Sequence, residues 1–176
     1  MSAAAATLAQ SLTYRSGGLT LRPADTGRAV RDCALAIIAV TAMIVLLDGA
    51  FYKDLLPSDY VTFYTAPLWP RTMLISLIAI GEEVRFRLIL MTAMFALGVL
   101  LRGRVSVRWA IATIVLCQIA NVGALVLADP IYGVFRWWLP GVVWGWLYWR
   151  HGWFAAVSAH ASTHLFMDPL LMLALS

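Results

Sequence analysis

The chain has 176 residues, of which 62% are hydrophobic and only 12% are charged, and its formal net charge is +4 at pH 7. Charged residues usually form about a quarter of a soluble domain, so this composition excludes an ordinary water-soluble fold and indicates a protein whose solvent is lipid. The positive charge comes from scattered arginines and a single lysine, which excludes a nucleic-acid-binding surface.

The N-terminal segment is rich in Ala, Ser and Gly and only weakly apolar. It lacks the basic stretch followed by a strongly apolar one that a secretory signal peptide has. We therefore predict a mobile cytoplasmic tail over residues 1–32, with a short surface helix as the alternative. A transmembrane domain is predicted over residues 33–176.

Five stretches of this domain approach the roughly 20 apolar residues that a membrane-spanning helix needs. They predict an all-α polytopic membrane bundle of about five transmembrane helices. The expected spans are residues 33–50, 71–101, 107–128, 134–149 and 153–175. Only the sequence RHG joins the last two, so they must form an antiparallel hairpin. Gly141 and Gly145, four residues apart in the fourth span, predict a close contact with another helix.

An aromatic, proline-containing stretch, FYKDLLPSDYVTFYTAPLWP, lies between the first two spans. Aromatic rings with polar edges favour the headgroup zone of a bilayer. We therefore predict that this stretch lies along the membrane interface or forms a short amphipathic helix there. Asp48, near the outer end of the first span, is expected to reach the headgroups.

The distribution of positive residues predicts the orientation of the chain. With the N-terminus inside, eight arginines fall in cytoplasmic segments, while only Lys53, Arg71 and Arg136 fall outside. This excess favours a cytoplasmic N-terminus and an external C-terminus. We expect an integral membrane protein of the bacterial inner membrane.

The second span contains GEEVRFRLIL, residues 81–90, with four charged side chains. A charge at that depth costs a few kcal/mol unless it is paired or hydrated. Glu83 and Arg87 are four residues apart on one helical face, so they can form an ion pair. Glu82 is turned roughly 100° away from Glu83 and stays available for another role. A purely structural ion pair is the alternative, but intramembrane ionisable residues favour a functional site.

Two other spans carry polar side chains at a similar depth. Asn121, with Gln118 one turn before it, is the strongest polar residue of the third span. His160 and His164 are four apart and share one face of the fifth span. A rise of about 1.5 Å per residue places Asn121 and His164 roughly level with Arg87. The pattern predicts one site shared by three helices, with satisfied core histidines as the alternative.

Together these motifs resemble the CAAX protease and bacteriocin-processing family, also called the Abi family, of glutamate-type intramembrane proteases. EEVRFR has the family's EExxxR form, and LPGVVWGWLYWRHGWFAAVSAHASTH resembles its glycine-spaced helix, tight turn and histidine. The resemblance covers about residues 68–166. It implies that Glu82 and Glu83 are the family's acidic pair, Arg87 its arginine and His160 its third-motif histidine.

Two positions depart from the family pattern. Asn121 stands where the second motif usually has a histidine, and His164 stands where the third motif usually has an asparagine. The histidine and the asparagine therefore look exchanged between the two motifs, so the predicted site keeps the same set of polar side chains. A non-functional exchange would leave a catalytically inactive member that binds peptides or acts in bacteriocin self-immunity. A small transporter is a third alternative, which the lack of an inverted repeat disfavours.

The resemblance implies an intramembrane endopeptidase that acts on a membrane-anchored protein or peptide. Burial makes a carboxylate a stronger base, so Glu82, aided by a histidine, is predicted to activate a water molecule. Asn121 or neutral His164 is predicted to donate a hydrogen bond to the developing oxyanion. No cofactor is expected. Zinc is the alternative, because two histidines and a glutamate can bind it, but the HxxxH motif here lacks the internal glutamate of HExxH.

Overall fold

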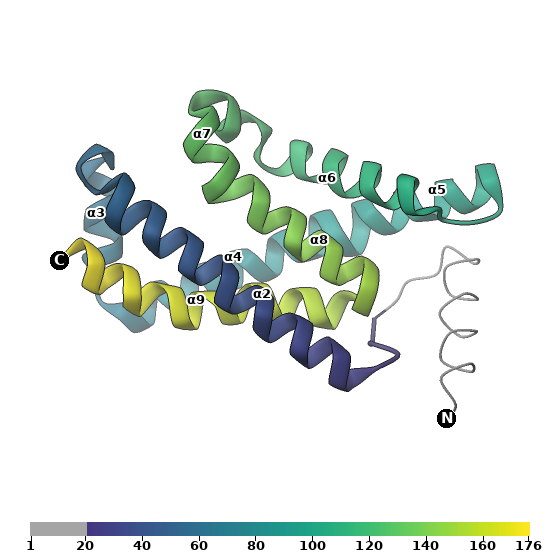
Figure 1. Ribbon diagram of the computed structural model, residues 1–176, viewed down its shortest axis with the longest axis horizontal. Coiled ribbons are helices and arrows are strands. Elements are labelled where there is room, and N and C mark those ends of the chain that lie inside the picture. The colour runs from purple at the N-terminus through teal and green to yellow at the C-terminus, as the bar shows by residue number, and fades with distance from the viewer. Residues whose placement is uncertain (1–20) are drawn as a thin grey trace.

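The computed structural model describes residues 21–176, which form an elongated bundle of helices without a β-strand (Figure 1). The prediction of an all-α fold is therefore confirmed. The longer helices are α2 (Thr26–Leu46), α4 (Leu68–Glu82), α5 (Thr92–Arg102), α6 (Val107–Ala128), α8 (Leu139–His151) and α9 (Trp153–Leu175). The short helices α3 (Ser58–Thr65) and α7 (Pro130–Gly133) and the 3-10 turn Lys53–Leu55 connect them.

The first helix begins inside the stretch that was predicted to be a mobile tail. The side chain of Asp25 accepts a hydrogen bond from the backbone nitrogen of Arg28 at 2.9 Å. This N-cap satisfies one of the free N–H groups at a helix start, so α2 begins at Thr26 and residues 26–32 are helical. The predicted tail over residues 1–20 lies outside the described residues.

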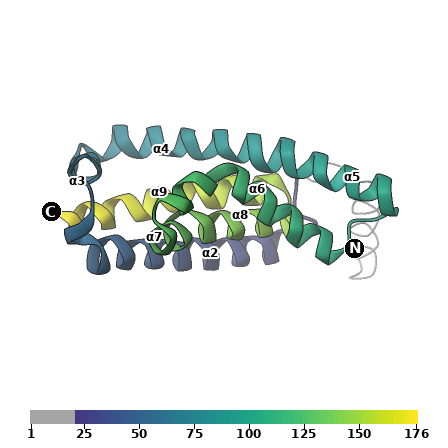
Figure 2. The same cartoon turned by 90° about the horizontal axis from the view of Figure 1, so that it is seen from above.

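Three segments have the wider winding of a π-helix, and each continues a neighbouring α-helix. They are η1 (Leu47–Phe51), η3 (Glu83–Met91) and η4 (Val134–Trp138). Each contains buried ionisable side chains, which are Asp48 in η1, Glu83 and Arg87 in η3 and Arg136 in η4. Segments of π-helix are rare and are frequent at functional sites. Three of the four charged residues of the second span therefore lie in a π-helical segment of one long rod, α4–η3–α5, and Glu82 is the last residue of α4 (Figure 2).

Three helical stretches within residues 21–176 are long and apolar enough to cross a membrane. They are Thr26–Phe51, Leu68–Arg102 and Val107–Ala128, which correspond to the first three predicted spans. The fourth and fifth predicted spans are helical but are not among these stretches. They stay predictions as membrane spans.

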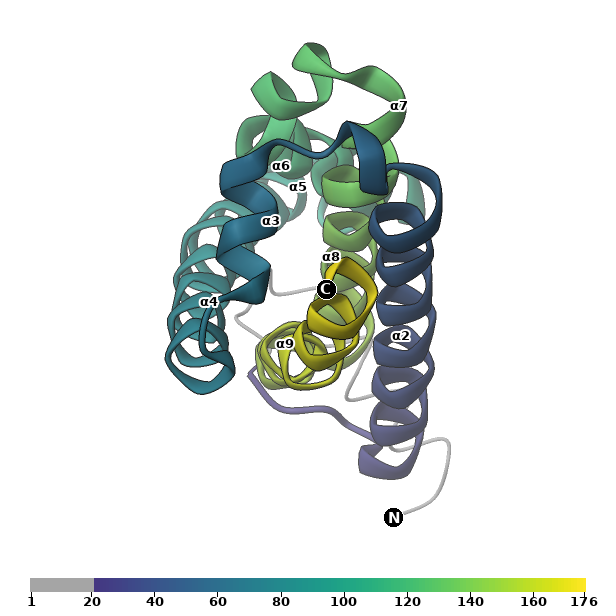
Figure 3. The same ribbon diagram turned by 90° about the vertical axis from the view of Figure 1, so that its left-hand side faces the viewer.

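Helix α9 lies at the centre of the bundle. It packs against α2 on one side and α4 on the other, and α8 also contacts it (Figure 3). The α9 residues Ala156, Ala159, Met167 and Leu171 are at most 1% exposed. Helix α6 contacts both α8 and η3. Side chains of α4, η3, α6 and α9 can therefore meet inside the bundle.

Helices α6 and α8 approach closely at the two glycines of the fourth predicted span. A methyl group on Gly145 would lie 2.9 Å from Ile114 Cγ2, and one on Gly141 would collide with the side chain of Gln118. The predicted close helix contact is confirmed. It brings the Gly141 carbonyl next to the polar residues of α6.

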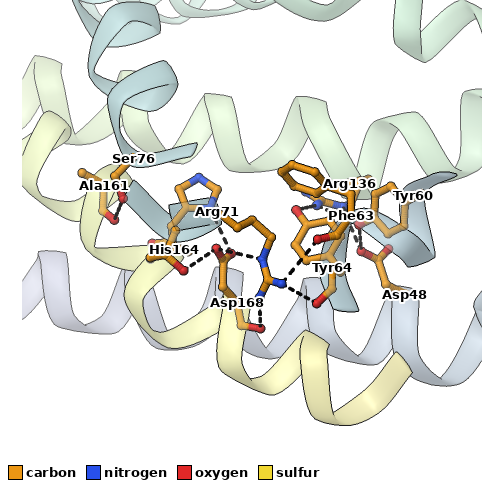
Figure 4. Close-up of polar contacts among 12 residues, drawn as sticks. Asp48, Tyr60, Phe63, Tyr64, Arg71, Ser76, Arg136, Ala161, His164 and Asp168 are labelled. Carbon is orange, nitrogen blue, oxygen red and sulfur yellow. Dashed lines mark hydrogen bonds and ion pairs between the residues drawn. The ribbon is translucent and has the colours of Figure 1, made fainter. Parts of the chain in front are cut away.

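Asp48 is buried, so the prediction that it reaches the headgroups is wrong. It accepts hydrogen bonds from the Tyr60 hydroxyl and from Arg136 Nε at 3.0 Å (Figure 4). The Tyr132 hydroxyl also donates to it at 3.0 Å. Burial raises the pKa of Tyr132 to about 12, which keeps this hydroxyl protonated as a donor. Arg136, which the charge count places on the external side of the membrane, is only 4% exposed within the bundle, because its side chain turns inward to this carboxylate.

Replacing Asp48 with Asn should lower the free energy of unfolding by about 3 kcal/mol, because the variant leaves Arg136 buried without its counter-charge. Unfolding by SDS titration in mixed micelles, followed by circular dichroism, measures this change. Asp25→Asn is the control, because Asp25 is about half exposed where it pairs with Arg28 and Asn caps a helix equally well. A loss below about 1 kcal/mol, typical of exposed pairs, would contradict the expected contribution of the buried pair.

Candidate active site

A cavity of about 670 Å³ lies among α4, η3, α6, α8 and α9. Five of the six predicted site residues line it, namely Glu82, Arg87, Asn121, His160 and His164. The sixth, Glu83, is fully buried and contacts His160. The structure therefore brings together the polar groups that the sequence placed at a similar depth on three helices.

Glu83 forms the centre of a buried polar cluster. Its Oε1 atom is 3.5 Å from Arg87 Nη1 and 2.9 Å from His160 Nδ1. The predicted ion pair between Glu83 and Arg87 is confirmed. The indole nitrogen of Trp153 also donates to the Glu83 carbonyl at 3.3 Å. Glu83 therefore joins η3 to α9, and it is this glutamate, rather than Glu82, that contacts His160.

Arg87 connects the same cluster to α6 and α8. Its Nη2 atom donates to the Gly141 carbonyl at 2.9 Å and to Gln118 Oε1 at 3.2 Å. Gln118 in turn donates to the Trp137 carbonyl at 3.2 Å. Arg87 is only 2% exposed, so its role is to hold neighbouring helices and the Glu83 carboxylate in place. The sequence showed Gln118 only as a polar neighbour of Asn121.

Glu82 differs from Glu83 in its surroundings. It is partly exposed and lines the cavity. Its carboxylate forms no hydrogen bond or ion pair with any residue in the described part of the chain, and Arg85, three residues later, is exposed. Glu82 is therefore the acidic group at this site that is free to bind a water molecule.

The two histidines of α9 lie side by side at the cavity. Their ring centroids are 5.7 Å apart, which confirms that they share a helical face. Trp144 stacks on the His160 ring at a centroid distance of 5.3 Å. The side chains of His160 and His164 are 14% and 12% exposed. Asn121 lines the same cavity from α6, so an amide group and two imidazoles face the space beside Glu82.

A second buried carboxylate, Asp168, lies one helical turn after His164. Its Oδ1 atom is 3.5 Å from His164 Nδ1 (Figure 4). Its Oδ2 atom accepts a hydrogen bond from Thr72 at 2.9 Å. The Nε atom of Arg71 is 3.8 Å from Oδ2. Sequence reasoning missed this group. The HxxxD spacing was a usable signal for the contact with His164, but the contact with α4 depends on tertiary packing.

The donor atoms available for a metal ion are few in the described part of the chain. Residues 21–176 contain no cluster of three or more His, Cys, Asp or Glu side chains that could hold a metal ion. The Nδ1 atoms of His160 and His164 already face Glu83 and Asp168. Metal-free chemistry stays a prediction to be tested by experiment.

Comparison with known proteins gives a family match over the cavity. The model of a family described as "Type II CAAX prenyl endopeptidase Rce1-like" matches residues 64–166. No curated protein and no solved structure matches the chain significantly. The matched range contains all six predicted site residues, whereas Asp48 and Asp168 lie outside it.

Proposed function

Because the chain belongs to the Type II CAAX prenyl endopeptidase Rce1-like family, whose model matches more than half of its length, we propose that it is an intramembrane endopeptidase. It hydrolyses a peptide bond of a membrane-anchored protein or peptide with a water molecule activated by Glu82. One observation carries this proposal. Glu82 lines a cavity with Asn121, His160 and His164 and has no partner in the described part of the chain, whereas Glu83 is paired with Arg87 and His160.

The first step of the proposed reaction is proton abstraction from water. Glu82 lines the cavity and has no partner in the described part of the chain, so its carboxylate can bind the water molecule directly. Glu82 takes a proton from the bound water, with His164 as a second proton acceptor at the same cavity wall. The resulting hydroxide attacks the carbonyl carbon of the scissile bond and forms a tetrahedral intermediate.

The second step is collapse of the tetrahedral intermediate. The amide N–H of Asn121 donates a hydrogen bond to its oxyanion, as donors placed around developing charge do in other hydrolases. The proton taken from water then passes to the nitrogen of the leaving group, and the C–N bond breaks. The products are a carboxylic acid and an amine, which together contain both protons of the water molecule, and Glu82 is restored as a base.

The remaining charged groups position the site. Glu83 holds His160 through Nδ1, and Trp144 supports the ring by stacking. Arg87 balances the charge of Glu83 and connects three helices. This arrangement fixes the imidazole beside the substrate, and small displacements of catalytic groups lower rates strongly.

The substrate class follows from the walls of the cavity and from the family. Apolar side chains of α2, α4 and α9, including Ile44, Ile75 and Met167, line the cavity beside the polar residues. Such walls suit an apolar membrane-anchored segment. We place the protein in the bacterial inner membrane with a cytoplasmic N-terminus, on the excess of arginine in the predicted cytoplasmic segments.

The proposal is tested with the purified full-length chain in liposomes and a farnesylated peptide that ends in a CAAX sequence and carries a fluorophore and a quencher. We expect cleavage near the C-terminus of this probe, identified by mass spectrometry. The same peptide without the farnesyl group is the matched control and should be cleaved more slowly. A chain that binds the probe without cleaving it or any membrane-anchored reporter would support the alternative, an inactive member that binds peptides.

We expect the same cleavage to be independent of metal ions, because the proposed water activation uses Glu82 and an imidazole. Prolonged treatment with EDTA or 1,10-phenanthroline should leave kcat unchanged, and elemental analysis should find substoichiometric zinc in active preparations. Activity that falls with chelator and returns with added zinc would replace this mechanism by a metal-assisted one.

A further inference from the structure

We propose that Asp168 is a positioning residue that holds His164 with its proton on Nδ1, so that the neutral ring offers an unprotonated Nε2 to the cavity as a proton acceptor. This inference rests on the proposed function and assigns one of the two roles that the sequence leaves open for His164. It is argued from the buried contact between α9 and α4, which includes Asp168, a residue outside the range that matches the family.

The first argument is that two neighbouring buried atoms each lack a hydrogen-bond partner. His164 Nδ1 and Asp168 Oδ1 are both buried, and neither has a hydrogen bond to any residue of the described chain. They lie 3.5 Å apart on one helical face. Buried polar atoms almost always have a partner, and a small rotation of either side chain brings this pair into hydrogen-bond distance. Because a carboxylate can only accept, the imidazole nitrogen must donate.

The second argument is that the other carboxylate oxygen is already fixed. Thr72 donates to Asp168 Oδ2 at 2.9 Å, and Arg71 Nη2 donates to the Asp168 backbone carbonyl at 3.3 Å. Arg71 is itself held by the carbonyls of Tyr64 and Ala66, each at 2.6 Å from Nη1. Asp168 is therefore anchored to α4, and its free oxygen points toward His164 (Figure 4).

The chemical consequence concerns the tautomer of His164. A neutral imidazole has one N–H group, and the hydrogen bond made by one nitrogen decides which nitrogen carries the proton. With the proton on Nδ1, the Nε2 atom can accept a proton from water but cannot donate to an oxyanion. His164 then acts beside Glu82 as a base, and Asn121 is left as the oxyanion donor. Asp168 would thereby compensate for the histidine that α6 lacks.

Other charged groups near His164 do not substitute for Asp168. His160 lies on the same helix and is paired with Glu83. Arg136 is bound to Asp48, and Arg71 contacts Oδ2 rather than the imidazole. Glu82 lines the cavity. Asp168 is thus the acidic group whose free oxygen lies beside His164 Nδ1.

Nitrogen-15 NMR of the protein in liposomes, labelled at histidine, measures the tautomer directly. The chain has three histidines, and each contacts a different acid: His151 meets Asp32, His160 meets Glu83 and His164 meets Asp168. At a pH where the rings are neutral, His164 should carry its proton on Nδ1. In Asp168→Asn the proton should move to Nε2 for His164 alone, because the amide can donate to Nδ1. A proton on Nε2 in the unmodified protein, or an unchanged tautomer in the variant, would overturn the proposal.

Two further variants keep the test decisive. Thr72→Val keeps the shape of the side chain but removes the donor to Asp168 Oδ2, so a partial shift of the same tautomer is expected even if Asp168→Asn folds poorly. Asp48→Asn is the matched control, because Asp48 is equally buried and is paired with an arginine but does not contact a histidine. It should leave all three tautomers unchanged.

Cleavage of the farnesylated probe supplies a second readout. Asp168→Asn should lower kcat by about 10²–10⁴-fold, the contribution of a correctly prepared general base, with KM nearly unchanged. Asp48→Asn should lower kcat of the folded fraction less than tenfold. Equal losses in the two variants would reduce Asp168 to a structural residue. If the unmodified chain does not cleave the probe, that result counts against the proposed function, while the NMR measurement still decides the role of Asp168.

Discussion

Replacement of Glu82 by Gln is expected to lower kcat for the farnesylated probe by about 10²–10⁴-fold, the usual contribution of a general base. The amide has nearly the same shape but cannot take a proton from water. The free energy of unfolding should change by less than about 0.5 kcal/mol, because the Glu82 carboxylate has no partner in the described part of the chain that the variant would disrupt. The expected phenotype is therefore a well-folded protein without activity.

Steady-state cleavage in liposomes and SDS titration measure these two quantities on the same preparation. Arg85→Gln is the matched control, because Arg85 belongs to the same η3 segment but is exposed. It should retain kcat. Full activity of Glu82→Gln would eliminate the proposed mechanism. If Glu82→Gln cleaves nothing but still complements a deletion of the gene, the alternative of peptide binding or self-immunity is supported.

The sequence predicted the contacts that helix geometry determines. Glu83 with Arg87, and His160 with His164, are each four residues apart, so a helix places them on one face wherever it lies in the bundle. Both contacts are present, at 3.5 Å between the ion-paired atoms and 5.7 Å between ring centroids. The hydrophobic runs likewise predicted helices, because a long apolar stretch in lipid must satisfy its own backbone.

The sequence could not predict which glutamate meets His160. That choice depends on the rotation of one helix about its axis relative to another. The segment that starts at Glu83 is a π-helix, in which the hydrogen bonds span one more residue than in an α-helix. Within η3 the contact of Glu83 with Arg87 four residues later is still made, so the rotation of the whole rod about its axis, which the sequence does not contain, decides which glutamate faces α9. Glu83 turns toward α9, and Glu82 is left at the cavity.

The same limit applies to the buried charges at the other end of the bundle. Asp48 was predicted to reach the headgroups, and Arg71 and Arg136 were predicted on the external side of the membrane, but no sequence pattern predicted that they pack inside the bundle. Each is at most 4% exposed, because Asp48 pairs with Arg136 and Arg71 lies beside Asp168. Two of the three positive residues predicted on the external side, Arg71 and Arg136, are thus buried beside acids, and Lys53 is the third. The cytoplasmic N-terminus stays a prediction from the charge count.

Replacement of Glu83 by Gln is expected to lower stability as well as activity, unlike Glu82→Gln. The variant leaves Arg87, which is 2% exposed, buried without a counter-charge. Loss of one member of a buried ion pair costs about 3–5 kcal/mol, and SDS titration should show a loss of this size. Activity should also fall, because His160 loses the carboxylate that holds its Nδ1 atom.

A double variant separates the ion pair from its other contacts. Arg87→Met removes the uncompensated charge, so Glu83→Gln combined with Arg87→Met should be less destabilised than the sum of the two single variants, by about 1–3 kcal/mol. Additive losses would show that Glu83 stabilises the bundle through His160 and Trp153 rather than through Arg87. A normal stability of Glu83→Gln would contradict the buried pair altogether. Two adjacent glutamates would then differ only in exposure, and the assignment of the base to Glu82 would lose its physical reason.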